Sequence, residues 1–60
     1  MIKYHIESWD PESETWERDF VSSPFAQYND ALFLARDWYK KYGDTLRIVE
    51  ETTEVLLTFG

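Results

Sequence analysis

The side chains best suited to acid–base chemistry are His5 and Glu7, which lie two residues apart near the start of the chain. A histidine beside a carboxylate is half of many catalytic groups. Residues 2–9 alternate between apolar and polar, so both side chains are expected on the outward face of a half-buried strand. No outward serine is expected nearby, and the chain has no cysteine to act as a nucleophile. We therefore interpret His5 as a surface histidine in a cross-strand pair and expect a protein that is not an enzyme.

A second candidate for chemistry is the dense group of carboxylates around the first predicted turn. Its members are Asp10, Glu12, Glu14, Glu17 and Asp19. The group lacks the alternating ligand positions and the central glycine of a calcium-binding loop. With no cysteine and one histidine, the chain cannot supply the usual ligands of a structural zinc site. No glycine-rich phosphate loop is present either, so we expect neither a metal nor a cofactor.

The balance of charge argues against nucleic acids and membranes as direct partners. The 60 residues include 12 acidic and 6 basic side chains, for a net charge of −6. Phosphate backbones and anionic lipids are bound by clustered lysines and arginines, and here only Lys40 and Lys41 are adjacent. The sequence shows neither the apolar run of a signal peptide nor a membrane span. Together with the absence of cysteine, this pattern favours a cytoplasmic location.

Alternating and helical patterns predict an α+β fold, a two-layer β-β-α-β-β domain with one helix packed on a four-stranded, mainly antiparallel sheet. Strands are expected over 2–9 and 15–21 and on either side of a turn at 52–53. Between the two hairpins, seven side chains recur at helical spacing: Tyr28, Ala31, Leu32, Ala35, Trp38, Tyr39 and Tyr42. Gly43 suits the left-handed position that ends a helix. We expect a single small domain over 1–60.

The first hairpin allows two registers, which place the same side chains on opposite faces. If Glu7 pairs with Arg18, Trp9 lies beside Trp16 on the outer face together with Phe20. A shift by one residue turns Trp16 and Phe20 inward and sets Glu7 against another glutamate. The inward register buries more aromatic area in a small core, so we favour it.

The second hairpin is expected to pair Ile48 with Leu57. That register directs five apolar side chains inward: Leu46, Ile48, Val55, Leu57 and Phe59. Val49 and Leu56 then point outward as a cross-strand pair.

A two-layer domain leaves one sheet face without a helix, and apolar residues on such a face indicate contact with another molecule. The expected contact residues are Trp9, Trp16, Arg47, Val49 and Leu56. We therefore expect a non-enzymatic protein-binding module, a small adaptor or inhibitor with a protein partner. A homodimer through this face is one arrangement of that kind. The alternative is an acidic nucleic-acid mimic that inhibits a DNA- or RNA-binding protein, which the charge of −6 suggests.

Overall fold

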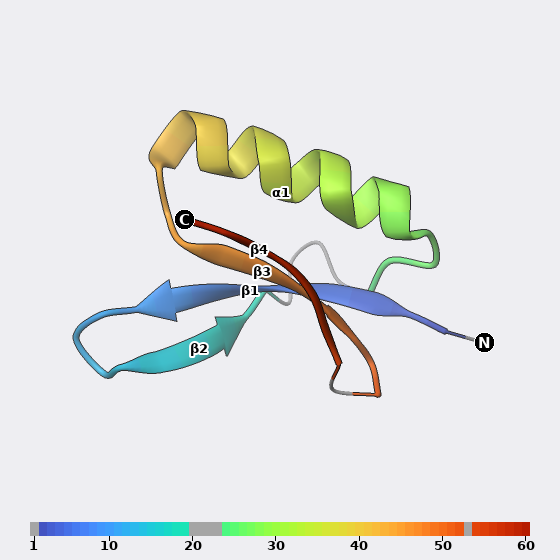
Figure 1. Ribbon diagram of the computed structural model, residues 1–60, viewed down its shortest axis with the longest axis horizontal. Coiled ribbons are helices and arrows are strands. Elements are labelled where there is room, and N and C mark those ends of the chain that lie inside the picture. The colour runs from blue at the N-terminus through green and yellow to red at the C-terminus, as the bar shows by residue number, and fades with distance from the viewer. Residues whose placement is uncertain (1, 20–23, 53) are drawn as a thin grey trace.

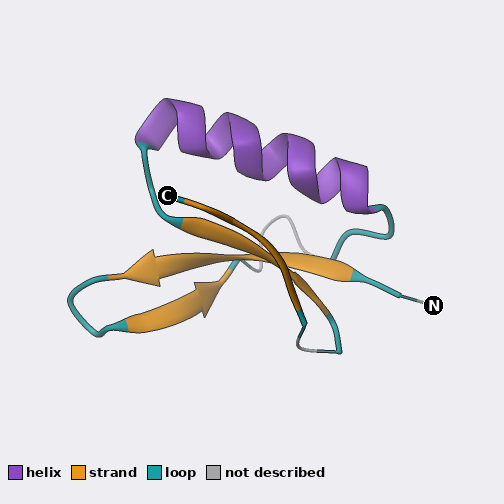
Figure 2. Cartoon of the chain, viewed as in Figure 1, coloured by secondary structure: helices purple, strands orange, loops and turns teal. Residues whose placement is uncertain are grey.

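The computed structural model describes residues 2–19, 24–52 and 54–60, which form two β-hairpins separated by one helix. The elements are β1 (Tyr4–Asp10), β2 (Thr15–Arg18), α1 (Tyr28–Tyr42), β3 (Leu46–Glu50) and β4 (Val55–Phe59). Neighbouring strands all pair antiparallel in the order β2-β1-β3-β4, and α1 lies across one face of this sheet (Figure 1). The two layers are distinct in Figure 2. The α+β, β-β-α-β-β fold predicted from the sequence is confirmed.

The helix ends where the sequence indicates. Gly43 adopts a left-handed conformation with φ of 69°, and its backbone N–H donates to the carbonyl oxygen of Tyr39 at 2.9 Å. Asp30 in the first turn and Lys40 and Lys41 in the last turn have the charges that complement the helix dipole. In the part of the chain that the structure describes, no helix has the length and apolar character needed to cross a membrane.

The core lies between α1 and the two central strands. Its fully buried members are Ile6, Ala31, Ala35, Leu46 and Ile48. The two alanines let the helix backbone approach the sheet closely. Aromatic contacts flank this core, with ring centroids 5.8 Å apart both for Tyr4 with Tyr28 and for Tyr39 with Phe59. The small central residues of the helix and the larger side chains around them, including Leu32, Leu34 and Trp38, therefore hold it on the sheet.

The first hairpin adopts the register that the sequence analysis did not favour. Glu7 pairs with Arg18 and Trp9 with Trp16, so the prediction that Trp16 turns inward is wrong. This register sets opposite charges side by side and brings two indole rings together, which outweighs the area that an inward Trp16 would bury. The predicted facing of Phe20 falls outside the described residues.

The second hairpin keeps its predicted pairing at one end and changes it at the other. Ile48 pairs with Leu57 as expected, but the register then shifts and Val49 pairs with Val55. Leu56 is the extra residue of this irregularity, so the predicted Val49–Leu56 pair is wrong. Directly paired residues share a face, and Val55 therefore lies on the outward side with Val49 instead of facing the core.

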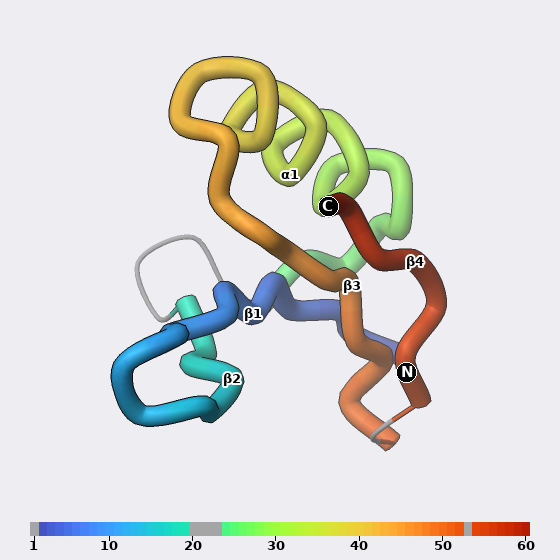
Figure 3. Tube along the Cα trace, turned by 60° about the vertical axis from the view of Figure 1, so that its left-hand side comes forward, coloured from blue at the N-terminus to red at the C-terminus, as the bar shows by residue number. Residues whose placement is uncertain are grey.

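The sheet twists strongly around its central strand. Figure 3 shows β2 and the far end of β3 extending away from α1 on either side of β1. The sheet face opposite the helix, which we call the outer face, is formed by both hairpins.

Candidate functional site on the outer face

Alternation along β1 decides which side chains reach the outer face. Ile6 points into the core, so its neighbours His5 and Glu7 point the other way, as does Trp9. Antiparallel pairing then places Arg18 and Arg47 on either side of Glu7. The outer face therefore combines aromatic side chains at one end with a row of charged side chains across its middle.

At one end of the outer face, three side chains form a continuous surface that we call the tryptophan cluster: Trp9, Trp16 and Arg47. The indole rings of Trp9 and Trp16 meet edge to face, with centroids 5.3 Å apart and planes at 61°. The Arg47 guanidinium lies 4.2 Å from the centroid of the Trp16 ring, within the range of a cation–π contact. Trp9 is 36% exposed and Trp16 is half-buried, so the cluster offers an exposed indole ring beside a fixed cation.

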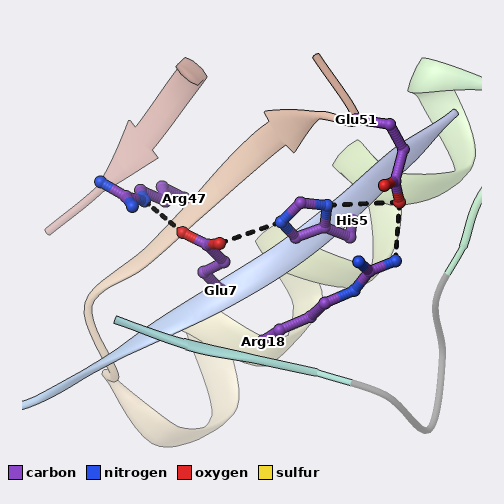
Figure 4. A network of polar contacts seen from close by, with 5 residues as sticks. All are labelled: His5, Glu7, Arg18, Arg47 and Glu51. Carbon is purple, nitrogen blue, oxygen red and sulfur yellow. Dashed lines mark hydrogen bonds and ion pairs between the residues drawn. The ribbon is translucent and has the colours of Figure 1, made fainter. Parts of the chain in front are cut away.

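Next to the tryptophan cluster, charged side chains form a chain of contacts that we call the polar network (Figure 4). Its members are Arg47, Glu7, His5, Glu51 and Arg18. One oxygen of the Glu7 carboxylate accepts from Nε of Arg47 at 2.6 Å, and the other lies 2.9 Å from Nε2 of His5. A charged carboxylate only accepts hydrogen bonds, so Nε2 of the imidazole is the donor. Glu7 therefore links the cluster to the buried part of the face.

The network continues from His5 to the second hairpin. Nδ1 of His5 lies 3.5 Å from Oε1 of Glu51, and Nη2 of Arg18 donates to that same oxygen at 2.6 Å. Arg18 and Glu51 come from opposite sides of β1, so their contact passes over the imidazole. His5 is only 7% exposed, and its interpretation as a surface histidine is therefore wrong.

The network changes the acidity of its central carboxylate. Burial of Glu7 acts to raise its pKa, but hydrogen bonds from His5 and Arg47 and attraction to the charge of Arg47 outweigh burial. The pKa of Glu7 is consequently held below its ordinary value of 4.5. Glu7 is thus a charged acceptor at neutral pH that keeps Arg47 in place beside Trp16.

Nε2 of His5 donates to Glu7, whereas the buried Nδ1 has no hydrogen-bond partner among the described residues. The ring is enclosed, which suits a structural role. Within residues 2–19, 24–52 and 54–60, no group of three His, Cys, Asp or Glu side chains is arranged to hold a metal ion. The acidic cluster at the first turn has local contacts instead. There, Asp10 accepts from the backbone N–H of Glu12 and the hydroxyl of Ser13, both at 3.0 Å.

The five predicted contact residues do not all lie together in the structure. Trp9, Trp16 and Arg47 lie together in the tryptophan cluster. Val49 is only 4% exposed and forms part of the base of the outer face, while Leu56 is 37% exposed on β4. Their predicted part in binding stays a prediction.

Two members of the polar network, Arg18 and Glu51, were not predicted from the sequence as site residues. The signal for Arg18 was its pairing with Glu7 in the register that was not favoured. Glu51 follows the end of β3 in a turn, where no periodic pattern indicates which way a side chain points.

Comparison with protein-family models, with curated proteins and with solved structures finds no match for this chain. A function is therefore inferred from the outer face itself. Its two parts differ in character, because the tryptophan cluster is accessible whereas His5 at the centre of the polar network is enclosed.

Proposed function

We propose that the protein is a non-enzymatic protein-binding module, an adaptor or inhibitor acting in the cytoplasm, whose partner contacts the tryptophan cluster. The observation that carries this proposal is the edge-to-face pair of Trp9 and Trp16 with Arg47 against Trp16. Tryptophan and arginine are the residue types most enriched among those that dominate binding energy in protein interfaces. They lie here on a sheet face that α1 does not cover.

The polar network supports this function by ordering the cluster before a partner arrives. Glu7 binds the Nε of Arg47 at 2.6 Å, so the long side chain is already held in one conformation. A partner then loses less side-chain entropy on binding than it would against a mobile arginine. His5 also supports a non-enzymatic role, because it is only 7% exposed and a substrate would have little access to its ring.

Capture of partners by the immobilised protein tests the proposal. The variant Trp9→Ala removes the exposed ring of the cluster, and Phe33→Ala is its matched control. Phe33 is another exposed aromatic side chain, 63% accessible, but it lies on α1. Both variants are first checked for a cooperative thermal transition. Lysate of the organism that encodes the protein is then applied at about 50 mM and about 500 mM NaCl. Attraction between charges is weakly screened at the lower concentration and strongly screened at the higher one.

We expect a protein that binds the wild type and Phe33→Ala at both salt concentrations and is lost from Trp9→Ala. Contacts through aromatic side chains depend little on salt, whereas contacts between many charges weaken steeply. A partner retained by Trp9→Ala and released at high salt would contradict the proposal and favour the acidic mimic of nucleic acid. The proposal would also be contradicted if Trp9→Ala and Phe33→Ala captured the same proteins.

A further inference from the structure

The edge strand β4 is almost wholly apolar. Four of its five residues, Val55-Leu56-Leu57-Thr58-Phe59, are apolar and none is charged. A continuous apolar run is typical of strands that are buried on both faces. In this structure, however, β4 is at the end of the sheet, and Val55, Leu56 and Leu57 are 43%, 37% and 36% exposed.

The opposite edge of the sheet, β2, has the features of an edge that does not pair with other chains. Strand β2 has four residues, of which Glu17 and Arg18 are charged. Short, charged edge strands resist pairing with other chains, whereas long apolar edges promote it. One edge is thus protected, and β4 is suited to receive another strand.

We propose that β4 pairs antiparallel with β4 of a second copy of this chain, joining both sheets into one. The twofold axis passes between Thr58 and its equivalent in the second copy. This register avoids the irregularity at Leu56 and sets Leu57 of each copy against Phe59 of the other. The two threonines face each other across the axis, a favourable cross-strand pair. The interface is self-complementary, as a symmetric dimer requires.

Pairing with a second copy is compatible with the net charge of −6 on each copy, because the charges lie away from the proposed contact. The side-chain carboxylate nearest to β4 along the chain is that of Glu54, which directly precedes the strand. In the proposed register, Glu54 and its equivalent lie at opposite ends, eight residues apart along the strands. At about 3.3 Å per residue the two carboxylates are about 26 Å apart, three times the screening length of about 8 Å in physiological salt. Strand β4 itself contributes no charged side chain to the interface.

The flank of α1 extends the surface that the second copy would cover. Tyr39 packs against Phe59, with centroids 5.8 Å apart, and Leu32 lies seven residues earlier on the same side of the helix. A twofold axis perpendicular to the joined sheet keeps both helices on one face, so these flanks approach each other. An ordinary dimer buries about 800 Å² on each copy. That is about a fifth of the 4226 Å² exposed here, so strand and helix flank must both take part.

Sedimentation equilibrium tests the dimer with two variants of equal net charge. Thr58→Glu sets two carboxylates against each other at the twofold axis. Thr58 is exposed within one copy, so the fold should tolerate the new carboxylate. Asn29→Glu adds the same charge at an exposed position near the start of α1, away from β4.

We expect the wild type and Asn29→Glu to form dimers at about 500 μM by mass action, and Thr58→Glu to dissociate at least about tenfold more readily. A wild type that stays monomeric at this concentration would overturn the proposal. So would a dimer that both variants weaken equally, or that neither variant weakens. A dimer lost in Trp9→Ala would place the contact at the tryptophan cluster and overturn it as well.

Amide hydrogen exchange gives a second measurement that needs no variant. Dimerisation through β4 should slow exchange of those amides in residues 56–60 that point away from β3 as the protein concentration rises, because they gain hydrogen-bond acceptors. Exchange in β2, the other edge, should not change with concentration. Protection that appears in β2, or nowhere in β4, would contradict the pairing.

Discussion

Arg18 and Glu51 form an ion pair of 2.6 Å that passes over the central strand β1. The two residues are 33 positions apart, one at the end of β2 and the other just after β3. Because β1 separates these strands in the sheet, the pair joins the two hairpins directly and encloses His5 beneath it. The outer face is therefore ordered by contacts between the hairpins as well as by the sheet.

The ion pair itself should contribute modestly to stability. Its side chains are 31% and 35% exposed, so water and salt screen much of the attraction. We expect Glu51→Gln to lower the free energy of unfolding by about 0.5–1 kcal/mol, with a smaller effect at high salt. Urea unfolding measures the change. Glu12→Gln, an exposed glutamate in the first turn, removes the same charge and should have less effect.

Acidification should weaken the fold through Glu7. The folded-state pKa of Glu7 lies below the ordinary value of 4.5, so its carboxylate stabilises the folded state fully above that value. This contribution is lost as the pH falls through the lowered folded pKa. Urea unfolding over a series of pH values below about 5 should show a shallower decline for Glu7→Gln than for the wild type. A decline of equal slope in both proteins would contradict the assigned role of Glu7.

His5 should matter for stability, contrary to the expectation for a surface histidine. His5→Ala removes a buried ring and leaves the Glu7 carboxylate without one of its two hydrogen bonds. Because hydrogen bonds to charged groups contribute about 1.5–3 kcal/mol, we expect a loss of about 2–3 kcal/mol in unfolding free energy. Lys3→Ala changes an exposed side chain nearby and is the control. A His5→Ala variant as stable as this control would show that the network adds little.

The helix face is tested by Ala35→Glu. Ala35 is fully buried against the sheet, so the new carboxylate would lose its water without gaining a partner. The cost of several kcal/mol is comparable to the whole stability of a domain this small, and we expect the cooperative thermal transition to disappear. Asn29→Glu places the same side chain on the exposed side of α1 and should melt like the wild type. An unchanged melt for Ala35→Glu would show that the helix packs through another face.

The sequence alone determined those features that depend on local periodicity. Alternation in β1 set which side chains face the core, and the 3.6-residue pattern placed Ala31 and Ala35 against the sheet. Gly43 marked the end of α1 because few other residues adopt its left-handed conformation easily. The pairing of Ile48 with Leu57 also followed from the apolar pattern. These features are encoded by neighbours along the chain.

Tertiary structure decided the register of the first hairpin and the character of the outer face. A slip of one residue exchanges the faces of a strand, and area burial alone favoured the wrong choice for Trp16. The observed register is supported by Arg47, which contacts both Trp16 and Glu7 although it lies 40 positions from Glu7 in sequence. His5 is buried for a similar reason, since Glu51 reaches it from the other hairpin. Local patterns contain no information about such contacts, because they exist only once the two hairpins have come together.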